Sequence, residues 1–453
     1  MLPSTTRSAP NTTPLLLTLG LGVFAGALDL GVLAPALPAI GQTFSVPTGD
    51  LAWVFSTYLL VNVASIAIAS TLADRYGRRR IYVASVALFA LGSVLAVVAP
   101  SYLVFLLARG IQAFGAGGIF PVATAAIADA VPKERRGAAL GLVAATWGLA
   151  AVIGPSLGGL IVHFVSWRWI FIANFPLSAV VIWLAMRYVP QRAPNERGPL
   201  DVVGLVLLVA GLLAVAQGVI TLYATVVIAG LAVLGLFAAW ERNCEFPLIP
   251  LKLFSTPQLA KTYGLEIAIG MLEGSLFFVP AVLVAAQGLS YAAAGFIAAL
   301  GALVFVAVIP LSGRALDRVG SRDVLLVGAV LTEIGLATFA LGFTSLPLSI
   351  LAMIVAGLGF GSLLGAPTRY IVANETTETT RATAVGLLSQ CLIIGQILGS
   401  SLAGGMMGSG ATENAGYRQA YLAFCAIAFV ALAIATTLKP RREERRAPLD
   451  VAA

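Results

Sequence analysis

Six ionisable residues lie within, or at the end of, long apolar stretches of this 453-residue sequence. They are Asp29, Arg109, Asp129, Glu266, Glu273 and Glu333. A charged side chain in hydrocarbon is costly, so such residues usually face a cavity, a partner charge or an ion pathway. A carboxylate removed from water can also take up and release a proton. These positions predict proton-dependent chemistry, with Asp29, Glu273 and Glu266 as the proton-binding residues.

Each of these residues also has a purely structural interpretation. Asp29 would pair with Arg109 and hold the first helices together, since an arginine inside a helical bundle is more often structural than ligand-binding. Glu266 would lie closer to the water and pair with Lys261. Glu333 would serve in helix packing. The sequence alone leaves these alternatives open.

Residues needed for most enzymatic mechanisms are scarce in this chain. There is one histidine, His163, and the three cysteines Cys244, Cys391 and Cys425 form no CxxC pair. No phosphate-binding GxxxxGK[ST] loop occurs, and the GxSxG run at 154–158 lacks both a preceding strand and a histidine within reach. We therefore expect no enzyme activity, no metal and no cofactor, and energy that comes from a gradient or from none.

The composition places the ionisable residues in a membrane protein. Hydrophobic residues make up 59 % of the chain and charged residues only 10 %, whereas roughly a quarter of the residues of a soluble domain are charged. Fourteen apolar stretches are each long enough to span a bilayer. The predicted spans are 15–38, 51–72, 82–99, 101–127, 138–162, 167–187, 200–220, 223–240, 259–286, 291–312, 323–343, 347–371, 383–407 and 417–438. We expect an all-α membrane protein.

The positions of the basic residues predict its orientation. If both termini lie in the cytoplasm, the cytoplasmic loops hold 24 of the 27 lysines and arginines, and the outer loops hold only Arg168 and Arg418. This asymmetry follows the positive-inside rule. We therefore expect a multi-pass protein of the cell membrane, surrounded by lipid and without a nucleic-acid partner.

A short pattern, Asp-Arg-x-Gly-x-Arg, occurs twice, between predicted spans 2 and 3 and between spans 10 and 11. Each copy is a tight turn in which Gly77 or Gly320 is free to take a positive φ. Such repetition is typical of transporters built from two similar halves, with the substrate site between them. The residues predicted to have structural or gating roles here are Asp74, Arg75, Gly77, Arg78, Asp317 and Arg318.

The fifth predicted span is rich in glycine. Gly148, Gly154, Gly158 and Gly159 allow helix backbones to approach closely, and Pro155 removes a helix hydrogen bond and favours a kink. We expect a close contact between the two halves that seals one side of a cavity, with purely structural packing as the alternative.

These motifs resemble those of the major facilitator superfamily over essentially the whole chain. The loop at 74–80 is similar to the signature loop of that family, with Ser70 in place of its first glycine. The run from Arg109 to Gly117 is similar to its Arg-x-x-Gln-Gly-x-Gly motif, with Ala113 in place of one glycine. The run at 154–159 resembles the motif of its proton-coupled antiporters.

Further stretches resemble the fourteen-helix drug:proton antiporter branch. The segment at 28–38 is similar to the first span of that branch, with Gly31 and Ala34 in place of its Thr and Asn, and the segment at 167–176 is similar to the entry into its sixth span. Spans 7 and 8, followed by an amphipathic linker at 245–254, match its additional helix pair.

The resemblance implies two six-helix bundles related by a pseudo-two-fold axis. We expect the first bundle at 1–190, two extra helices with the linker at 191–257, the second bundle at 258–440 and a cytoplasmic tail at 441–453. The protein is expected to be a monomer.

Few polar residues are predicted to line a cavity between the halves. The candidate substrate-binding residues are Trp53, Tyr58, Asn62, Gln112, Trp147, Phe277, Phe278, Gln390 and Gln396. An aromatic lining with a carboxylate suits lipophilic cations, so the predicted function is proton-coupled export of lipophilic or cationic small molecules. Transport of lipids or lipid-linked metabolites is the alternative, and a channel, sensor or membrane enzyme is disfavoured.

Overall fold

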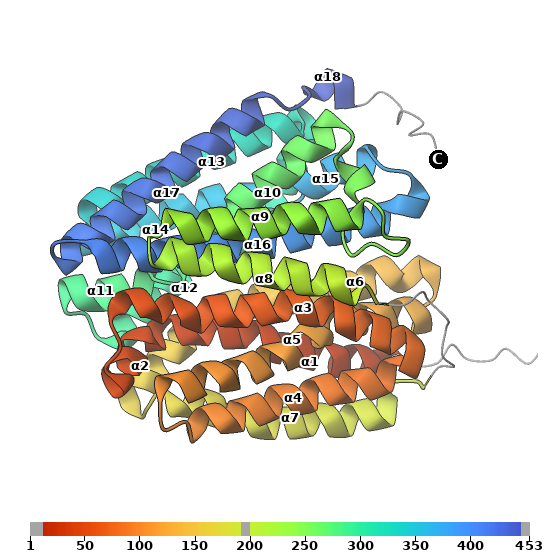
Figure 1. Ribbon diagram of the computed structural model, residues 1–453, viewed down its shortest axis with the longest axis horizontal. Helices are drawn as coiled ribbons and strands as arrows, with labels where there is room; N and C mark the ends of the chain where they lie inside the picture. The colour runs from red at the N-terminus through yellow and green to blue at the C-terminus, as the bar shows by residue number, and fades with distance from the viewer. Residues whose placement is uncertain (1–11, 192–199, 445–453) are drawn as a thin grey trace, which may run out of the picture.

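The computed structural model describes residues 12–191 and 200–444, and within this part of the chain all regular secondary structure is helical (Figure 1). In chain order the elements are α1 (Thr13–Leu33), η1 (Ala34–Ala36), α2 (Leu37–Phe44), η2 (Thr48–Leu51), α3 (Ala52–Tyr76), α4 (Arg78–Val97), α5 (Tyr102–Ala130), α6 (Lys133–Phe164), α7 (Arg168–Tyr188), α8 (Val202–Ile220), α9 (Ala224–Glu241), η3 (Leu251–Phe254), α10 (Pro257–Leu276), α11 (Val279–Gln287), α12 (Tyr291–Val319), α13 (Ser321–Gly342), α14 (Leu346–Leu363), α15 (Pro367–Asn374), α16 (Glu378–Ser409), α17 (Glu413–Thr436) and α18 (Arg441–Glu444). The expected tail at 441–453 lies outside the described residues from 445 onward.

Fourteen segments of the described chain are long and apolar enough to cross a membrane, which confirms the predicted number. Three of them are broken by short irregularities next to proline, which cannot donate the backbone hydrogen bond that a continuous helix requires. The breaks separate α1 from α2, α10 from α11, and α14 from α15. The first span continues to Phe44, beyond its predicted end, because Pro38 is tolerated in the first turn of α2.

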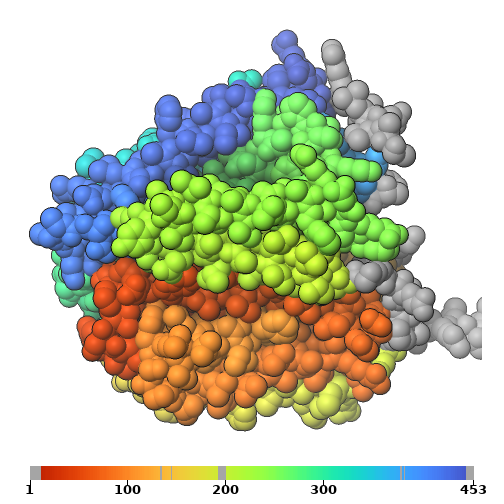
Figure 2. Space-filling view, viewed as in Figure 1, coloured from red at the N-terminus to blue at the C-terminus, as the bar shows by residue number. Residues whose placement is uncertain are grey.

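The helices form two groups. Helices α1 and α3 to α7 pack mainly on one another, and so do α10 and α12 to α17. The groups meet where α6 packs along α12 and α3 packs along α16. Helices α8 and α9 form a hairpin whose α8 contacts both α3 and α16, and Figure 2 shows this hairpin lying across the boundary between the groups.

The two copies of the repeated loop take the same backbone form. Helix α3 gives way to α4 at the single residue Gly77, and α12 gives way to α13 at Gly320. Their φ angles are 94° and 96°, in the region that a residue with a Cβ rarely adopts. This confirms the predicted tight turns. Both loops lie at the end of the molecule where α1 begins and α17 ends, on the right in Figure 1. We call it the basic end because both loops, at 74–80 and 317–322, are rich in arginine.

The helix pair α8–α9 is anchored at the basic end by two carboxylates. Asp201 caps α8 by accepting a hydrogen bond from Gly204 N (2.9 Å) and another from the indole of Trp240 (3.0 Å). Burial by itself would raise the pKa of Asp201, but these hydrogen bonds outweigh it and hold that pKa below its ordinary value. Glu241 accepts hydrogen bonds from the backbone of Leu248 and Ile249. Glu241 thereby holds the middle of the linker at 245–254, which leads to the second group of helices.

Candidate functional site

A buried ion pair joins α1 to α5. Arg109 donates a hydrogen bond to Asp29 Oδ2 at 2.6 Å, and neither side chain is exposed at all. The pair exists because α5 presents Arg109 towards α1, and a lone charge at this depth would pay the full cost of desolvation. The structural interpretation of Asp29 therefore has a definite geometry.

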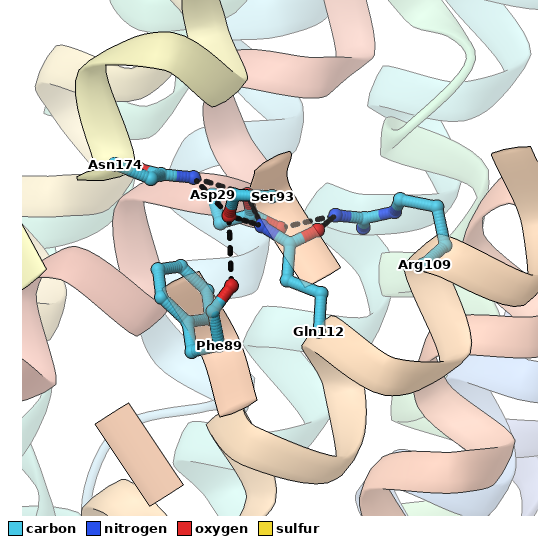
Figure 3. Close-up of polar contacts among 6 residues, drawn as sticks. All are labelled: Asp29, Phe89, Ser93, Arg109, Gln112 and Asn174. Carbon is cyan, nitrogen blue, oxygen red and sulfur yellow. Dashed lines mark hydrogen bonds and ion pairs between the residues drawn. The ribbon is translucent and has the colours of Figure 1, made fainter. Parts of the chain in front are cut away.

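Two side-chain amides and one hydroxyl complete the cluster around the carboxylate of Asp29 (Figure 3). Gln112 donates to Oδ1 at 2.7 Å and Asn174 donates to the same oxygen at 3.2 Å. Ser93 accepts from both amides and donates to the carbonyl of Phe89. Both oxygens of Asp29 thus accept hydrogen bonds from buried side chains.

The guanidinium of Arg109 is less completely paired than the carboxylate. Its Nη1 also donates to Gln112, but its Nε and Nη2 are buried and have no hydrogen-bond partner among the described residues. The ring of Tyr58 lies beneath it, 4.3 Å from the guanidinium carbon. A cation over an aromatic face gains electrostatic stabilisation, so Tyr58 compensates in part for the missing acceptors.

A cavity of about 170 Å³ lies between the two groups of helices. It is lined by Ala27, Leu30, Gly31, Ala34, Trp147, Ala151, Pro155, Glu273, Leu276, Phe277, Val279, Pro280, Ala298, Gly301, Ala302, Phe305, Met353, Ala356, Gly357, Phe360, Leu364 and Gln396. Among the described residues that line it, the one ionisable side chain is that of Glu273 of α10, whose Oε2 accepts a hydrogen bond from Gln396 of α16 at 3.0 Å. The remaining wall is almost entirely apolar. Such a cavity can hold a small lipophilic molecule next to a single carboxylate.

The predicted substrate-binding residues divide into two sets. Trp147, Phe277 and Gln396 line the cavity, and the Trp147 side chain is 44 % exposed. The others do not line it: Trp53, Tyr58, Asn62, Gln112, Phe278 and Gln390. Tyr58, Gln112 and Phe278 are buried by helix packing, for example where Phe278 meets Phe55 edge to face.

Glu266 and Glu333 lie away from the cavity. Glu266 is only 5 % exposed, its Oε2 has no hydrogen-bond partner in the described chain, and Thr368 of α15 is its neighbour. The expected pairing with Lys261 is absent from the described contacts, because that ammonium donates to the carbonyl of Thr437 at 2.9 Å. Glu333 is half-buried on α13, and its Oε2 has no hydrogen-bond partner among the described residues.

The glycines of α6 face two different neighbours. Gly154 and Gly158 pack on Gly31 and Val32 of α1, within one group of helices, whereas Gly159 packs on Tyr291 of α12 in the other. Our expectation that this whole run joins the two halves is therefore wrong for Gly154 and Gly158. The contact between the halves involves Gly159, Gly148, which faces Val306 of α12, and Pro155, whose carbonyl meets Gly295.

We expect Gly158→Ala to destabilise the protein strongly. A Cβ at this position would lie 2.1 Å from the carbonyl oxygen of Val32, so α1 and α6 would have to separate. Overpacking of this kind typically costs about 1–3 kcal/mol. Gly137→Ala on the same helix is the control, since nothing lies within 4 Å of its Cβ. Thermal unfolding in detergent should show a lowered midpoint for Gly158→Ala alone; equal midpoints would contradict the close contact.

The first repeated loop is held by charge pairs. Arg78 contacts Asp74 at 2.5 Å and Asp129, at the end of α5, at 3.3 Å. These contacts tie the α3–α4 turn to α5 at the basic end. Arg75 lies over the ring of Tyr76, 5.8 Å from its centroid. The loop is remote from the cavity, and none of its residues lines it.

We expect Arg78→Ala and Asp74→Asn to slow the conformational cycle several-fold while leaving substrate affinity unchanged. The physical reason is that the loop fixes helix ends at the basic end and does not touch the cavity. Transport rates and dye binding, measured on the same purified variants, test this. Weakened binding with unchanged turnover is the contrary result.

Sequence reasoning missed several polar residues that the structure places at key contacts. Ser93 belongs to the Asp29 cluster, and Ser56 of α3 lies 3.1 Å from both Ser400 and Ser401 of α16, across the boundary between the halves. Serine is common in membrane helices, so nothing in a single sequence distinguishes the serines at these contacts from serines elsewhere in the spans. Asn174 lay within a motif quoted above, but its contact with Asp29 could not be foreseen from spacing.

Comparisons with known proteins agree with this architecture. The family model for the Major Facilitator Superfamily matches residues 19–272 and 262–452. An uncharacterised MFS-type transporter, YfiU, of Bacillus subtilis is 31 % identical over 86 % of this chain and 79 % of its own length. The multidrug resistance protein Stp of Mycobacterium tuberculosis is 32 % identical over 86 % of this chain and 75 % of its own.

The solved structures show the same fold at lower sequence identity. A crystal structure of a D-xylose-proton symporter superposes with a TM-score of 0.71 at 15 % identity, covering 96 % of this chain and 99 % of that one. Fourteen membrane-crossing helices, two groups of helices around a central cavity, and a family match along nearly the whole sequence lead to one conclusion. The chain is a transporter that belongs to the Major Facilitator Superfamily.

Proposed function

We propose that this transporter is a proton-coupled exporter of lipophilic, chiefly cationic, small molecules that works by alternating access. The observation that carries the proposal is the carboxylate of Glu273, held by Gln396 in an otherwise apolar cavity between the two halves. A cation gains most from a carboxylate where water is sparse. The similarity over most of the chain to Stp, a multidrug resistance protein, supports the export of drug-like small molecules in general.

The aromatic residues of the cavity favour this substrate class over sugars. Trp147 and Phe277 offer apolar faces to a cation or a planar ring. A sugar requires many convergent hydrogen-bonding groups, and the lining offers mainly the Glu273–Gln396 pair and the Trp147 indole. At 15 % identity, the likeness to a D-xylose-proton symporter is a likeness of fold alone.

The described conformation suits loading from the basic end, which we place in the cytoplasm by the distribution of charge. The halves touch towards the opposite end, where a Cβ on Gly49 would lie 3.0 Å from Gly404 O and one on Gly295 would lie 2.3 Å from Pro155 O. At the basic end, by contrast, Gly141 of α6 and Gly386 of α16 face open space. We propose an inward-facing state, which the contacts between the halves at the opposite end support.

We assign proton coupling to two carboxylates, Asp29 in the first group of helices and Glu273 in the second. Asp29 lies in a closed cluster in this state, whereas Glu273 faces the cavity where a substrate would compete with a proton. Competition at one carboxylate is sufficient for exchange, because substrate and proton then bind alternately as access changes sides. No cofactor is required by this scheme.

Dye transport in proteoliposomes with an imposed pH gradient tests the proposal. We expect a lipophilic cationic dye to accumulate against its gradient, and an uncoupler to abolish that accumulation. Vesicles containing labelled phospholipid serve as a parallel assay. Transport of the lipid without transport of the dye, or dye movement independent of the pH gradient, would contradict the proposal.

A further inference from the structure

The second repeated loop is held differently from the first. If Gly77 is aligned with Gly320, Asp74 aligns with Asp317 and Arg78 with Ser321. The same alignment places Val372 opposite Asp129. The second loop therefore lacks, at these positions, both the arginine and the carboxylate that pair in the first.

The C-terminal helix α18 supplies a carboxylate to this loop from elsewhere in the chain. Glu444 accepts a hydrogen bond from Ser321 N at 3.3 Å through Oε2, and its Oε1 accepts one from the Ser321 hydroxyl. Ser321 is the first residue of α13, where backbone N–H groups have no partner within the helix. Glu444 thus serves both as a helix cap and as the negative charge favoured at a helix N-terminus.

Further contacts hold α18 in this position. Arg441 donates to the carbonyl of Asp317 at 2.8 Å, and a Cβ on Gly320 would lie only 2.7 Å from Arg441 Cβ. Gly320 therefore permits a side chain of the C-terminal segment to lie directly on the turn. The chain is also fixed just before α18, because Lys439 pairs with Glu375 and its N–H donates to Gln258.

We propose that the segment 439–444 is a latch that positions the second repeated loop during transport, with Glu444 giving Ser321 the carboxylate contact that Asp129 gives Arg78 in the first loop. The latch ties the α12–α13 turn to the end of α17. Helix α12 packs on α6 of the other half as well as on α14. If the α12–α13 turn were loose, the end of α12 would move, and with it the packing of α12 on α6 of the other half. The proposal does not depend on the identity of the substrate.

The chain offers a matched control for the test. Glu443 is adjacent to Glu444 in the same short helix and is exposed. Glu443→Ala and Glu444→Ala remove the same chemical groups, but of these two carboxylates only that of Glu444 accepts hydrogen bonds from Ser321. Hydrogen exchange at the first turn of α13 should accelerate about tenfold in Glu444→Ala, as expected for loss of hydrogen bonds to a charged group. It should not change in Glu443→Ala.

Transport measurements then separate positioning from substrate binding. We expect Glu444→Ala to lower turnover several-fold with no change in the substrate concentration for half-maximal rate. Ser321→Ala should have a smaller effect and none beyond that of Glu444→Ala in the double variant, since both remove one interaction. Equal exchange rates in Glu443→Ala and Glu444→Ala would overturn the latch. Faster exchange with unchanged turnover would overturn its role in transport.

Discussion

Replacing Asp29 with asparagine is expected to abolish gradient-driven efflux. The change leaves the Arg109 guanidinium buried without its counter-charge, and removal of one partner of a buried ion pair typically costs about 3–5 kcal/mol. It also removes the only carboxylate of the cluster formed with Gln112, Asn174 and Ser93. Both a structural and a proton-binding role therefore predict a large loss, and uncoupler-sensitive transport of a cationic dye measures it.

A double variant separates the two roles of Asp29. Asp29→Asn with Arg109→Gln removes both charges, so the site again contains no unpaired ion and much of the lost stability should return. If Asp29 binds the transported proton, the double variant melts near the wild-type temperature and still fails to transport. Recovery of uncoupler-sensitive transport would show that only the ion pair matters. Wild-type transport by Asp29→Asn alone would remove Asp29 from the mechanism.

Replacing Glu273 with glutamine is expected to impair transport of cationic substrates more than that of neutral ones. Among the described residues that line the cavity, Glu273 is the one ionisable residue, and the amide that replaces it keeps the size but not the charge. Losing a charged contact in a cavity with little water should lower the transport efficiency for the cation about tenfold to hundredfold. A neutral dye of similar shape should lose less.

Glu266→Gln is the matched comparison on the same helix. Glu266 is buried beside Thr368 and does not line the cavity, so its replacement should have the smaller effect on both dyes. Equal losses for both dyes in Glu273→Gln would leave Glu273 as a proton-coupling group only. A larger loss in Glu266→Gln would show that cargo or protons pass α10 outside the cavity described above.

Much of the architecture follows from local features of the sequence. Spans must be long and apolar because the bilayer requires every backbone hydrogen bond to be satisfied within the helix. Their number can therefore be counted from hydropathy. The turns at Gly77 and Gly320 are equally local, since only glycine readily takes the positive φ that a one-residue connection between helices needs. These turns, together with the runs at 109–117 and 154–159, carry the resemblance to the family.

The candidate site was predicted only in part. Asp29, Glu273 and Glu266 stood out because charge is rare within apolar stretches, and hydropathy detects such residues wherever they point. Which of them faces a cavity depends on the rotation of each helix and on its partners. Trp147 and Gln396 line the cavity, but Tyr58 and Gln112 surround Arg109. In a lipid-embedded helix, apolar residues occupy both the outer and the inner faces, so periodicity does not distinguish them.

The location in a membrane, the fourteen spans, the repeated turns and the short list of ionisable residues all follow from the amino-acid sequence. Helix packing, in contrast, encloses Asp29 with Arg109 and turns Glu273 towards the cavity, and it places Gly158 on α1 and Gly159 on α12. It also brings Glu444 onto the second loop as a cap. The physical reason is that these contacts join residues far apart in the chain, and their energies depend on distances and burial that no local pattern encodes.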